Sequence, residues 1–505
     1  MQHLHLDLIR VREGRWKSYF SVFLFFATWF VCLIAITSPS HAQKYTAQVW
    51  ISSENIDGQP GKQIEPQPDI PLLPPDGAPV PAIAIRPDHR RQSILGIGSS
   101  MEETSVWNLL RMSPEIRQDI MEKLFDQSKG IGWNTLRIVF GSPGCCGYPY
   151  YTYCDLPQGS TDPALSTFSI QKDIDYGIIG MVQQALSINP NILIFATSFT
   201  PPAWMKDNGS LIGGKLLDQY IPVLAAYLRM AIQAYQRQGI PIYAVSPQNE
   251  PGHETDYPSA DISPSQAVSL VKALRRELDN HGLATKIWIF DGFYSDYRYP
   301  FGILSDPTCR ACISGVAWHP YMGNPSAMSK VLGRYPHLDQ LMTERGLIYG
   351  ASAVAEMLNI FQNGARLYAN WVTASDTNND HLNNPAAQTQ DWHWMPVRPD
   401  ATDPDLVSIQ ESYYLEGLVA KFVRPGAHLL AGNAGDPATV TAAAFLTPDK
   451  NIVAIVVNQT TGTQPFKLLC RGWQINASLP QKSVGAYRWP AAAARANSPW
   501  FLLSD

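Results

Sequence analysis

Two glutamates, Glu250 and Glu344, stand where short apolar segments of the sequence give way to polar residues. Ala244–Ser246 leads into Pro-Gln-Asn-Glu-Pro, and Gln340–Met342 leads into Thr-Glu-Arg-Gly. The apolar segments are typical of buried strands, and the proline or glycine after each motif indicates that the chain leaves the strand there. Two carboxyl groups placed by strand ends can work as a pair, with one protonated and the other ionised.

Hydrolysis of a glycosidic bond requires such a pair. One carboxyl group protonates the leaving oxygen and the other attacks the anomeric carbon, and in retaining enzymes the two lie about 5–5.5 Å apart. Asn249, directly before Glu250, could bond to the sugar 2-hydroxyl group, a contact that strengthens in the transition state. For either glutamate taken alone, a solvated loop residue or a salt-bridge partner is the alternative interpretation.

Strand-like and helical patterns alternate over the region that would position this pair. Helical spacing of apolar residues covers Ser113–Phe125, Tyr220–Gln238 and Ser263–His281, and a serine precedes a proline as N-cap in the first and third. The strand-like segments are Ile94–Gly98, Thr135–Phe140, Ile192–Thr197, Ile242–Ser246, Ile287–Phe290, Gly315–Trp318, Gln340–Thr343 and Leu367–Trp371.

Eight strands separated by helices predict an α/β fold, a (β/α)₈ TIM barrel. Catalytic residues of such barrels come from the C-terminal ends of the strands, and Glu250 and Glu344 follow the fourth and seventh segments. A doubly wound open sheet is the alternative. The sequence disfavours that fold because no glycine-rich phosphate loop opens a helix.

The remaining chain predicts an attached all-β sandwich domain. Short strand-like runs separated by turn residues are Ala442–Phe445, Ile452–Asn458, Phe466–Leu469 and Ser483–Trp489. The proline-rich stretch from Gly58 to Pro81 reads as an extended linker or a surface loop. We therefore predict a signal peptide over 1–42, an N-terminal strand and proline-rich segment over 43–93 that partly joins the sandwich, the catalytic barrel over 94–407, and the sandwich over 408–505.

The N-terminus has the pattern of a targeting segment. A basic start precedes an apolar run from Tyr19 to Ile36, and Ser40 and Ala42 are small residues that a signal peptidase accepts. Cleavage after Ala42 predicts a secreted or periplasmic protein with no stable membrane span. The alternative is a retained anchor, because the run is nearly long enough to cross a bilayer.

Composition and cysteine content limit the kinds of partner and cofactor. The net charge of −5 gives no general attraction to nucleic acid, and 45% hydrophobic residues indicate a globular protein. The cysteines beyond the targeting segment are Cys145, Cys146, Cys154, Cys309, Cys312 and Cys470. An even number in an exported protein suggests disulfides of unassigned pairing. The CxxC at Cys309 could be half a zinc site, but nothing completes it, so no metal or other cofactor is expected.

From Ile94 to Trp489 the chain resembles glycoside hydrolase family 30, which contains glucosylceramidase, β-1,6-glucanases and bacterial relatives. The motifs that carry the resemblance occur in the same order throughout: Gly96–Ser100 followed by Glu103-Thr104, Leu136-Arg137-Ile138, Tyr151–Asp155, Ser198–Lys206, Asn249-Glu250-Pro251, Trp318–Tyr321, Thr343-Glu344 and Ser483–Trp489. The resemblance implies a barrel with a β-sandwich and hydrolysis of a β-glycoside, an oligo- or polysaccharide or a glycolipid, with retention.

The resemblance also implies a role for each matching residue. Glu250 would be the acid/base, Glu344 the nucleophile, and Asn249 the partner of the sugar 2-hydroxyl. The others implied are Trp204 beside the glycone, Arg137 orienting the nucleophile, His319 and Tyr321 near the nucleophile, and Trp371 as an aromatic wall. A loop anchor for His319, core packing for Trp204 and a structural ion pair for Arg137 are the alternatives.

Two segments depart from the glucosidase branch of that family. The branch carries a sugar-binding aspartate in the loop after the second strand, whereas Ser142–Gly147 has no carboxylate here. We therefore expect this protein to recognise the far edge of the glycone differently. The long polar segment Asn378–Asp405, with Trp392 and Trp394, is expected to shape the aglycone side, and a buried loop anchor is the alternative for its aromatic residues. A non-catalytic carbohydrate-binding protein, a transglycosylase and a metallohydrolase are the rival functions.

Overall fold

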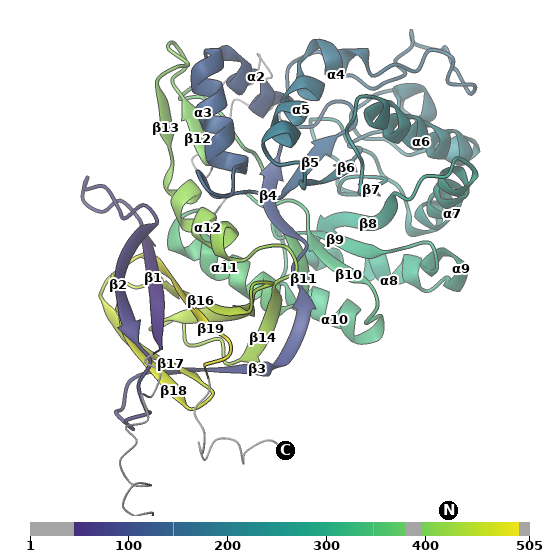
Figure 1. The fold of residues 1–505 in the computed structure, drawn as a ribbon. Helices are drawn as coiled ribbons and strands as arrows, with labels where there is room; N and C mark the ends of the chain where they lie inside the picture. The colour runs from purple at the N-terminus through teal and green to yellow at the C-terminus, as the bar shows by residue number, and fades with distance from the viewer. Residues whose placement is uncertain (1–44, 145, 347, 379–394, 494–505) are drawn as a thin grey trace, which may run out of the picture. The chain divides into compact units, whose positions relative to one another are not determined.

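The protein is described by a computed structural model that covers residues 45–144, 146–346, 348–378 and 395–493. Eight parallel strands close into a barrel in the order β10-β11-β4-β5-β6-β7-β8-β9 (Figure 1). They are β4 (Gly96–Ser100), β5 (Thr135–Val139), β6 (Leu193–Thr197), β7 (Ala244–Ser246), β8 (Lys286–Phe293), β9 (Gly315–His319), β10 (Asp339–Met342) and β11 (Ala365–Asn370). The expected barrel is confirmed, and each strand overlaps one predicted segment.

Burial on both faces explains why these strands read as continuous apolar runs. Along β9, Ala317 packs with Phe195, Trp288 and Leu341 in a small cluster of barrel-strand residues, whereas its neighbours Val316 and Trp318 belong to the larger core that includes the helices. Successive strand residues therefore point alternately into the barrel and toward the surrounding helices.

The helices lie mostly between consecutive barrel strands. They are α2 (Glu103–Arg111), α3 (Pro114–Phe125), α4 (Gln171–Asp175), α5 (Ile178–Ile188), α6 (Ile221–Arg237), α7 (Pro264–Asn280), α8 (Arg298–Leu304), α9 (Pro307–Arg310), α10 (Ser326–Arg334), α11 (Gly350–Gln362) and α12 (Glu411–Phe422). Ser113 and Ser263 cap α3 and α7 as expected, and Ser263 forms a capping box with Gln266. Within the described residues, no helix combines the length and apolarity needed to cross a membrane.

A second sheet of nine strands has the order β18-β17-β3-β14-β15-β16-β19-β1-β2. Its strands are β1 (Thr46–Ser53), β2 (Glu65–Pro71), β3 (Ala82–Ser93), β14 (His428–Gly432), β15 (Thr441–Leu446), β16 (Asn451–Asn458), β17 (Gln464–Cys470), β18 (Trp473–Leu479) and β19 (Ser483–Pro490). A short hairpin, β12 (Val397–Pro399) with β13 (Val407–Ile409), stands apart. The first strand pairs antiparallel with the last, so segments from both ends of the chain complete this sheet.

The proline-rich stretch differs from the expected linker or surface loop. Residues 65–71 form β2 at the edge of the sheet, where Pro66, Pro68 and Pro71 are tolerated because an edge strand leaves one side of its backbone unpaired.

Helix α12 follows the barrel yet also contacts the sheet, since the Phe422 and Trp50 rings lie 4.5 Å apart. The targeting segment lies outside the described residues.

The expected disulfides do not form among the cysteines that the structure describes. Cys154, Cys309, Cys312 and Cys470 are free thiols, no disulfide joins Cys146 to any of these four, and Cys145 lies outside the described residues.

Candidate active site

Glu250 is held at the end of β7 by hydrogen bonds to the neighbouring strands. Its backbone N–H donates to the carbonyl of Asp291 at 2.8 Å, and that of Asn249 donates to the carbonyl of Ser198 at 2.7 Å. These bonds fix Glu250 in the left-handed region, with φ of 43°, which a non-glycine residue adopts only when its surroundings impose it. In this conformation the side chain of Glu250 reaches His319, with Oε1 lying 2.6 Å from Nδ1.

Glu344 is positioned in the same way after β10. The N–H of Thr343 donates to the carbonyl of Trp318 at 3.1 Å, and the carbonyl of Arg345 accepts from the N–H of Trp371 at 2.8 Å. The buried guanidinium group of Arg345 also donates to Glu356 at 3.0 Å. The backbone on both sides of Glu344 is therefore tied to β9 and β11.

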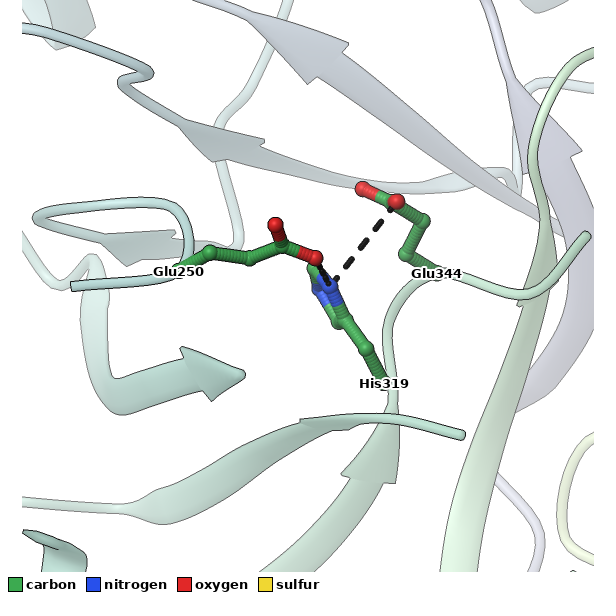
Figure 2. Close-up of side chains that lie close together, drawn as sticks. All are labelled: Glu250, His319 and Glu344. Carbon is green, nitrogen blue, oxygen red and sulfur yellow. Dashed lines mark hydrogen bonds and ion pairs between the residues drawn. The ribbon is translucent and has the colours of Figure 1, made fainter. Parts of the chain in front are cut away.

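Figure 2 shows how Glu250, His319 and Glu344 converge. His319 Nδ1 lies 2.6 Å from Glu250 Oε1 and 3.8 Å from Glu344 Oε1. One oxygen of each glutamate and one ring nitrogen of His319 all lie within 4.8 Å of one another. The hydroxyl of Tyr321 donates to Glu344 Oε1 at 2.9 Å. Two carboxyl groups from distant parts of the sequence thus share one buried site at the C-terminal ends of the strands.

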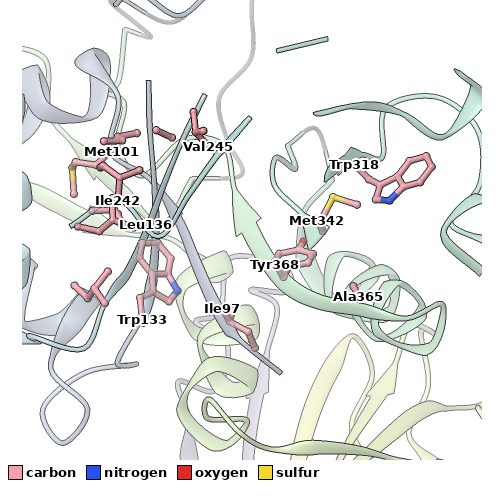
Figure 3. Packing of buried hydrophobic residues seen from close by; sticks show 14 of the residues in the cluster. Ile97, Met101, Trp133, Leu136, Ile242, Val245, Trp318, Met342, Ala365 and Tyr368 are labelled. Atoms are coloured by element: carbon pink, nitrogen blue, oxygen red, sulfur yellow. The ribbon is translucent and has the colours of Figure 1, made fainter. Parts of the chain in front are cut away.

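Arg137 binds three oxygen-bearing groups of this site at once. It points into the barrel because its neighbours on β5, Leu136 among them, pack in the outer core (Figure 3). The guanidinium group donates to Glu344, to Asn249 Oδ1 at 2.8 Å and to Asp291 Oδ2 at 3.0 Å. Arg137 is completely buried, so it is the fixed counter-charge for both carboxylates.

Asp291, at the end of β8, is a site residue that the sequence analysis missed. Its Oδ1 faces His319 Nε2 at 3.1 Å and accepts a hydrogen bond from the Thr343 hydroxyl, while Oδ2 accepts from Arg137. A carboxylate at the end of the apolar run Trp288–Phe290 was the signal that could have identified it, as it did for Glu250 and Glu344. Asp291 completes a buried network that spans the barrel mouth.

The burial and the charges of this network shift the pKa values of its members in different directions. Burial raises the pKa of Glu250, and the nearby charge of Glu344 raises it further, although the hydrogen bond from His319 opposes both. Burial disfavours the charged form of His319, but the carboxylates of Glu344, Asp291 and Glu250 outweigh it and raise its pKa to about 10. Despite its burial, Asp291 has a pKa well below the ordinary value because Arg137 and His319 face it.

An aromatic wall adjoins the network. The rings of Phe199, after β6, and Trp371, at the end of β11, stack with centroids 5.8 Å apart. The guanidinium carbon of Arg137 lies 5.2 Å from the Trp371 centroid and 5.8 Å from that of Phe199. Phe199 was not singled out in the sequence. It stands in the Ser198–Lys206 motif, where only Trp204 was considered.

Trp204 is placed differently from the other site residues. Its indole N–H donates to the carbonyl of Cys154 at 2.9 Å, and its ring meets Tyr220 edge-on at 5.1 Å. These contacts link Trp204 to loops outside the carboxylate network. The structure therefore brings together Glu250, Glu344, Asn249, Arg137, His319 and Tyr321, with Trp371 beside them. Trp392 and Trp394 lie outside the described residues.

Glu250, His319 and Glu344 are also the residues of the described chain that come close enough to hold a metal ion. Their existing bonds do not suit a dication. Both ring nitrogens of His319 already face carboxylates, and Glu344 already pairs with the guanidinium group of Arg137. A metal ion would have to displace these contacts and share a site with a buried cation.

We expect Arg137→Met to destabilise the fold by about 3–5 kcal/mol, because it leaves Glu344 and Asp291 buried without their counter-charge. Urea unfolding measures this effect. Arg137→Lys is the control, since it retains the charge but not the three-way contact, and its loss should be smaller. Equal unfolding midpoints for wild type and Arg137→Met would show that the ion pairs do not stabilise the native state.

The raised pKa of His319 predicts a loss of stability in alkali. Because the native pKa of about 10 exceeds the ordinary value of 6.5, this histidine stabilises the fold fully below about pH 6.5, and the contribution disappears as the pH rises to about 10. Unfolding free energies between pH 6.5 and 10 should fall by a few kcal/mol more for wild type than for His319→Gln. If the unfolding free energies of the two proteins changed with pH by the same amount, that result would contradict a charged His319.

The comparisons with known proteins agree with this fold. The family model for the glycosyl hydrolase family 30 TIM-barrel domain matches residues 94–402, and the model for the glycosyl hydrolase family 30 beta sandwich domain matches residues 430–487. A solved endo-β1,6-glucanase structure superposes with a TM-score of 0.77 at 24% identity, covering 88% of this chain and 100% of that chain.

Two curated relatives carry different enzyme names. An endo-1,6-β-D-glucanase of Trichoderma harzianum is 27% identical over 436 residues, which cover 79% of this chain and 85% of that protein. The lysosomal acid glucosylceramidase of Mus musculus is 24% identical over 431 residues, which cover 76% of this chain and 79% of that protein. With the barrel model matching more than half of its length, the chain belongs to glycosyl hydrolase family 30, a family of glycosidases.

Proposed function

We propose that the protein is a secreted retaining β-glycosidase that hydrolyses β-1,6-linked glucan chains. The observation that carries the mechanism is the approach of Glu250 and Glu344, with oxygens within 4.8 Å of each other. This spacing fits the retaining geometry of about 5–5.5 Å and leaves no room for the water that an inverting enzyme places between substrate and base. The substrate follows from the named activity of the Trichoderma harzianum relative.

In the first step Glu344 attacks the anomeric carbon while Glu250 donates its proton to the leaving oxygen. The raised pKa of Glu250 suits this role, because burial and the charge of Glu344 favour the protonated form that a general acid needs. Arg137 and Tyr321 hold the two oxygens of Glu344 in place for the attack. The products are a glycosyl ester of Glu344 and the released alcohol.

In the second step Glu250 removes a proton from water, which attacks the anomeric carbon and releases Glu344. Once Glu344 is esterified, its negative charge no longer raises the pKa of Glu250. The same carboxyl group therefore becomes a better base when the mechanism needs one. Two displacements at one carbon return the β configuration.

Proton NMR during hydrolysis of β-1,6-glucan oligosaccharides tests this proposal. The first sugar hemiacetal to appear should be the β anomer, which then mutarotates to the α anomer. The α anomer appearing first would overturn retention. Hydrolysis of β-1,4- or β-1,3-linked oligosaccharides in preference to β-1,6 would overturn the assigned linkage, and sugar binding without turnover would favour a binding protein.

Secretion rests on the basic and apolar N-terminus with small residues before position 43. Expression of the full chain in a bacterial host should place active protein outside the cytoplasm, with Gln43 as its first residue by N-terminal sequencing. A protein that stays in the membrane fraction and retains residues 1–42 would instead support an anchor.

A further inference from the structure

The aromatic wall beside the active site ends at a tyrosine from the loop that follows Glu250. Tyr257 is half-buried and packs against the cluster that contains Phe199, Trp371 and Met395. Its ring centroid lies 6.4 Å from that of Phe199. The wall therefore runs from the guanidinium group of Arg137, the partner of Glu344, to Tyr257.

The ring of Tyr257 covers Gly144 in the loop after β5. A Cβ atom built on Gly144 would lie 3.1 Å from both Cγ and Cδ2 of Tyr257 and 3.3 Å from Cε2. Carbon atoms in good contact lie about 3.5–4.0 Å apart, so any side chain at position 144 would press on the ring. Gly144 is not among the residues with positive φ, and its backbone would accept another residue. Tyr257 thus occupies the space that a side chain from this loop would otherwise use.

The loop that carries Tyr257 is firmly held. The carbonyl of Tyr257 accepts hydrogen bonds from the hydroxyls of Thr255 and Ser259, each at 3.1 Å. The buried Lys206 ammonium group joins this loop to the preceding one by donating to the carbonyls of Ser259 at 2.8 Å and Gly213 at 2.7 Å. The ring is therefore a pre-positioned surface.

The position of the wall indicates which part of the substrate it faces. In the proposed mechanism the glycone remains bonded to Glu344, whereas the leaving group lies next to Glu250. The wall begins at Arg137, which binds Glu344, and so it borders the glycone side. An aromatic ring presents a flat apolar face that can pack against the apolar face of a sugar ring. A surface of this kind accepts a glycone that is itself substituted by a further sugar.

We infer that Tyr257, seated on Gly144, is a specificity-determining residue that binds the sugar unit attached to the glycone, and that it favours cleavage within chains. The inference rests on the proposed function and adds the direction in which the chain extends. The bound unit is a β-linked hexosyl residue on the non-leaving side of the reacting sugar.

Two aryl glycosides with the same leaving group test this inference, one with a single β-glucosyl unit and one with a β-1,6-linked glucosyl pair. Tyr257→Ala should lower kcat/KM for the two-ring substrate by about 10-fold or more and leave the one-ring substrate within about 3-fold. Tyr257→Phe should retain the preference. Tyr45→Ala, which removes a half-buried tyrosine directly before β1, is the matched control and should change neither value.

A double-mutant cycle tests the contact with Gly144 separately from activity. Gly144→Ala should lower the unfolding midpoint in wild type and have little effect in Tyr257→Ala, because the clashing ring is then absent. Equal losses on both aryl substrates in Tyr257→Ala would overturn the inference and leave the proposed function intact. If wild type hydrolyses neither substrate, the proposed function fails first.

Discussion

Glu344→Gln is expected to lower kcat/KM by about 10⁴-fold or more on every substrate that the enzyme hydrolyses. Glutamine has nearly the same shape and can still accept the hydrogen bond from Tyr321, and Asp291 remains as a counter-charge for Arg137, so the fold and substrate binding should be preserved. An amide cannot form the glycosyl ester, because its neutral carbonyl oxygen is far less nucleophilic than a carboxylate oxygen. The loss should therefore fall on kcat, with KM little changed.

Two measurements make this prediction specific. Glu277→Gln is the matched control, since Glu277 also pairs with an arginine, Arg229 at 3.2 Å, but lies on α7. It should retain full activity. A 2-deoxy-2-fluoro glycoside should add one glycosyl mass to the peptide that contains Glu344 in wild type and none in Glu344→Gln. Residual turnover above about 1%, or a label on another peptide, would remove Glu344 from the nucleophile role.

Glu250→Ala should separate substrates by their leaving groups. Natural linkages leave as poor alkoxides that need a proton, so their hydrolysis should slow by about 10²–10⁴-fold. Activated aryl glycosides need no such help in the first step, and their kcat/KM should change far less. Their kcat should still fall, because no base activates water in the second step, and KM should fall with it as the glycosyl-enzyme accumulates.

Adding azide gives a more specific test of the Glu250→Ala prediction. Azide needs no general base, and the space left by alanine admits it, so kcat on the aryl substrate should recover and a β-glycosyl azide should form. Asp256→Ala removes an exposed carboxylate from the same loop and is the control, with no change expected on either substrate class. Equal losses of Glu250→Ala on natural and aryl substrates would contradict an acid/base role.

The sequence was informative wherever a residue's neighbours along the chain set its environment. A β-strand with both faces buried must be apolar, and this pattern located all eight barrel strands. A carboxylate directly after such a strand stands at the barrel mouth, and this reasoning identified Glu250 and Glu344. Serine before proline marked the starts of α3 and α7 because the capping interaction is local.

The missed features depend on contacts between segments far apart in the chain. Asp291 became a site residue only when β8 brought it against Arg137 and His319, which come from β5 and β9. His319 was expected near the nucleophile, and its shorter contact, 2.6 Å, is to Glu250. Which carboxylate a histidine faces depends on the register of neighbouring strands, and no spacing along the chain encodes that register.

The sequence by itself determined the barrel, the order of its strands and the two catalytic candidates, because periodic burial and strand-end chemistry are local properties. The tertiary structure alone decided the electrostatic environment of the two glutamates. The pKa of Glu250 depends on its burial and on His319 and Glu344, which lie 69 and 94 positions away in the sequence. It also decided that Tyr257 closes over Gly144 and that Trp204 turns toward Cys154. Packing between loops sets these orientations, and a side chain's direction follows from the atoms that surround it in space.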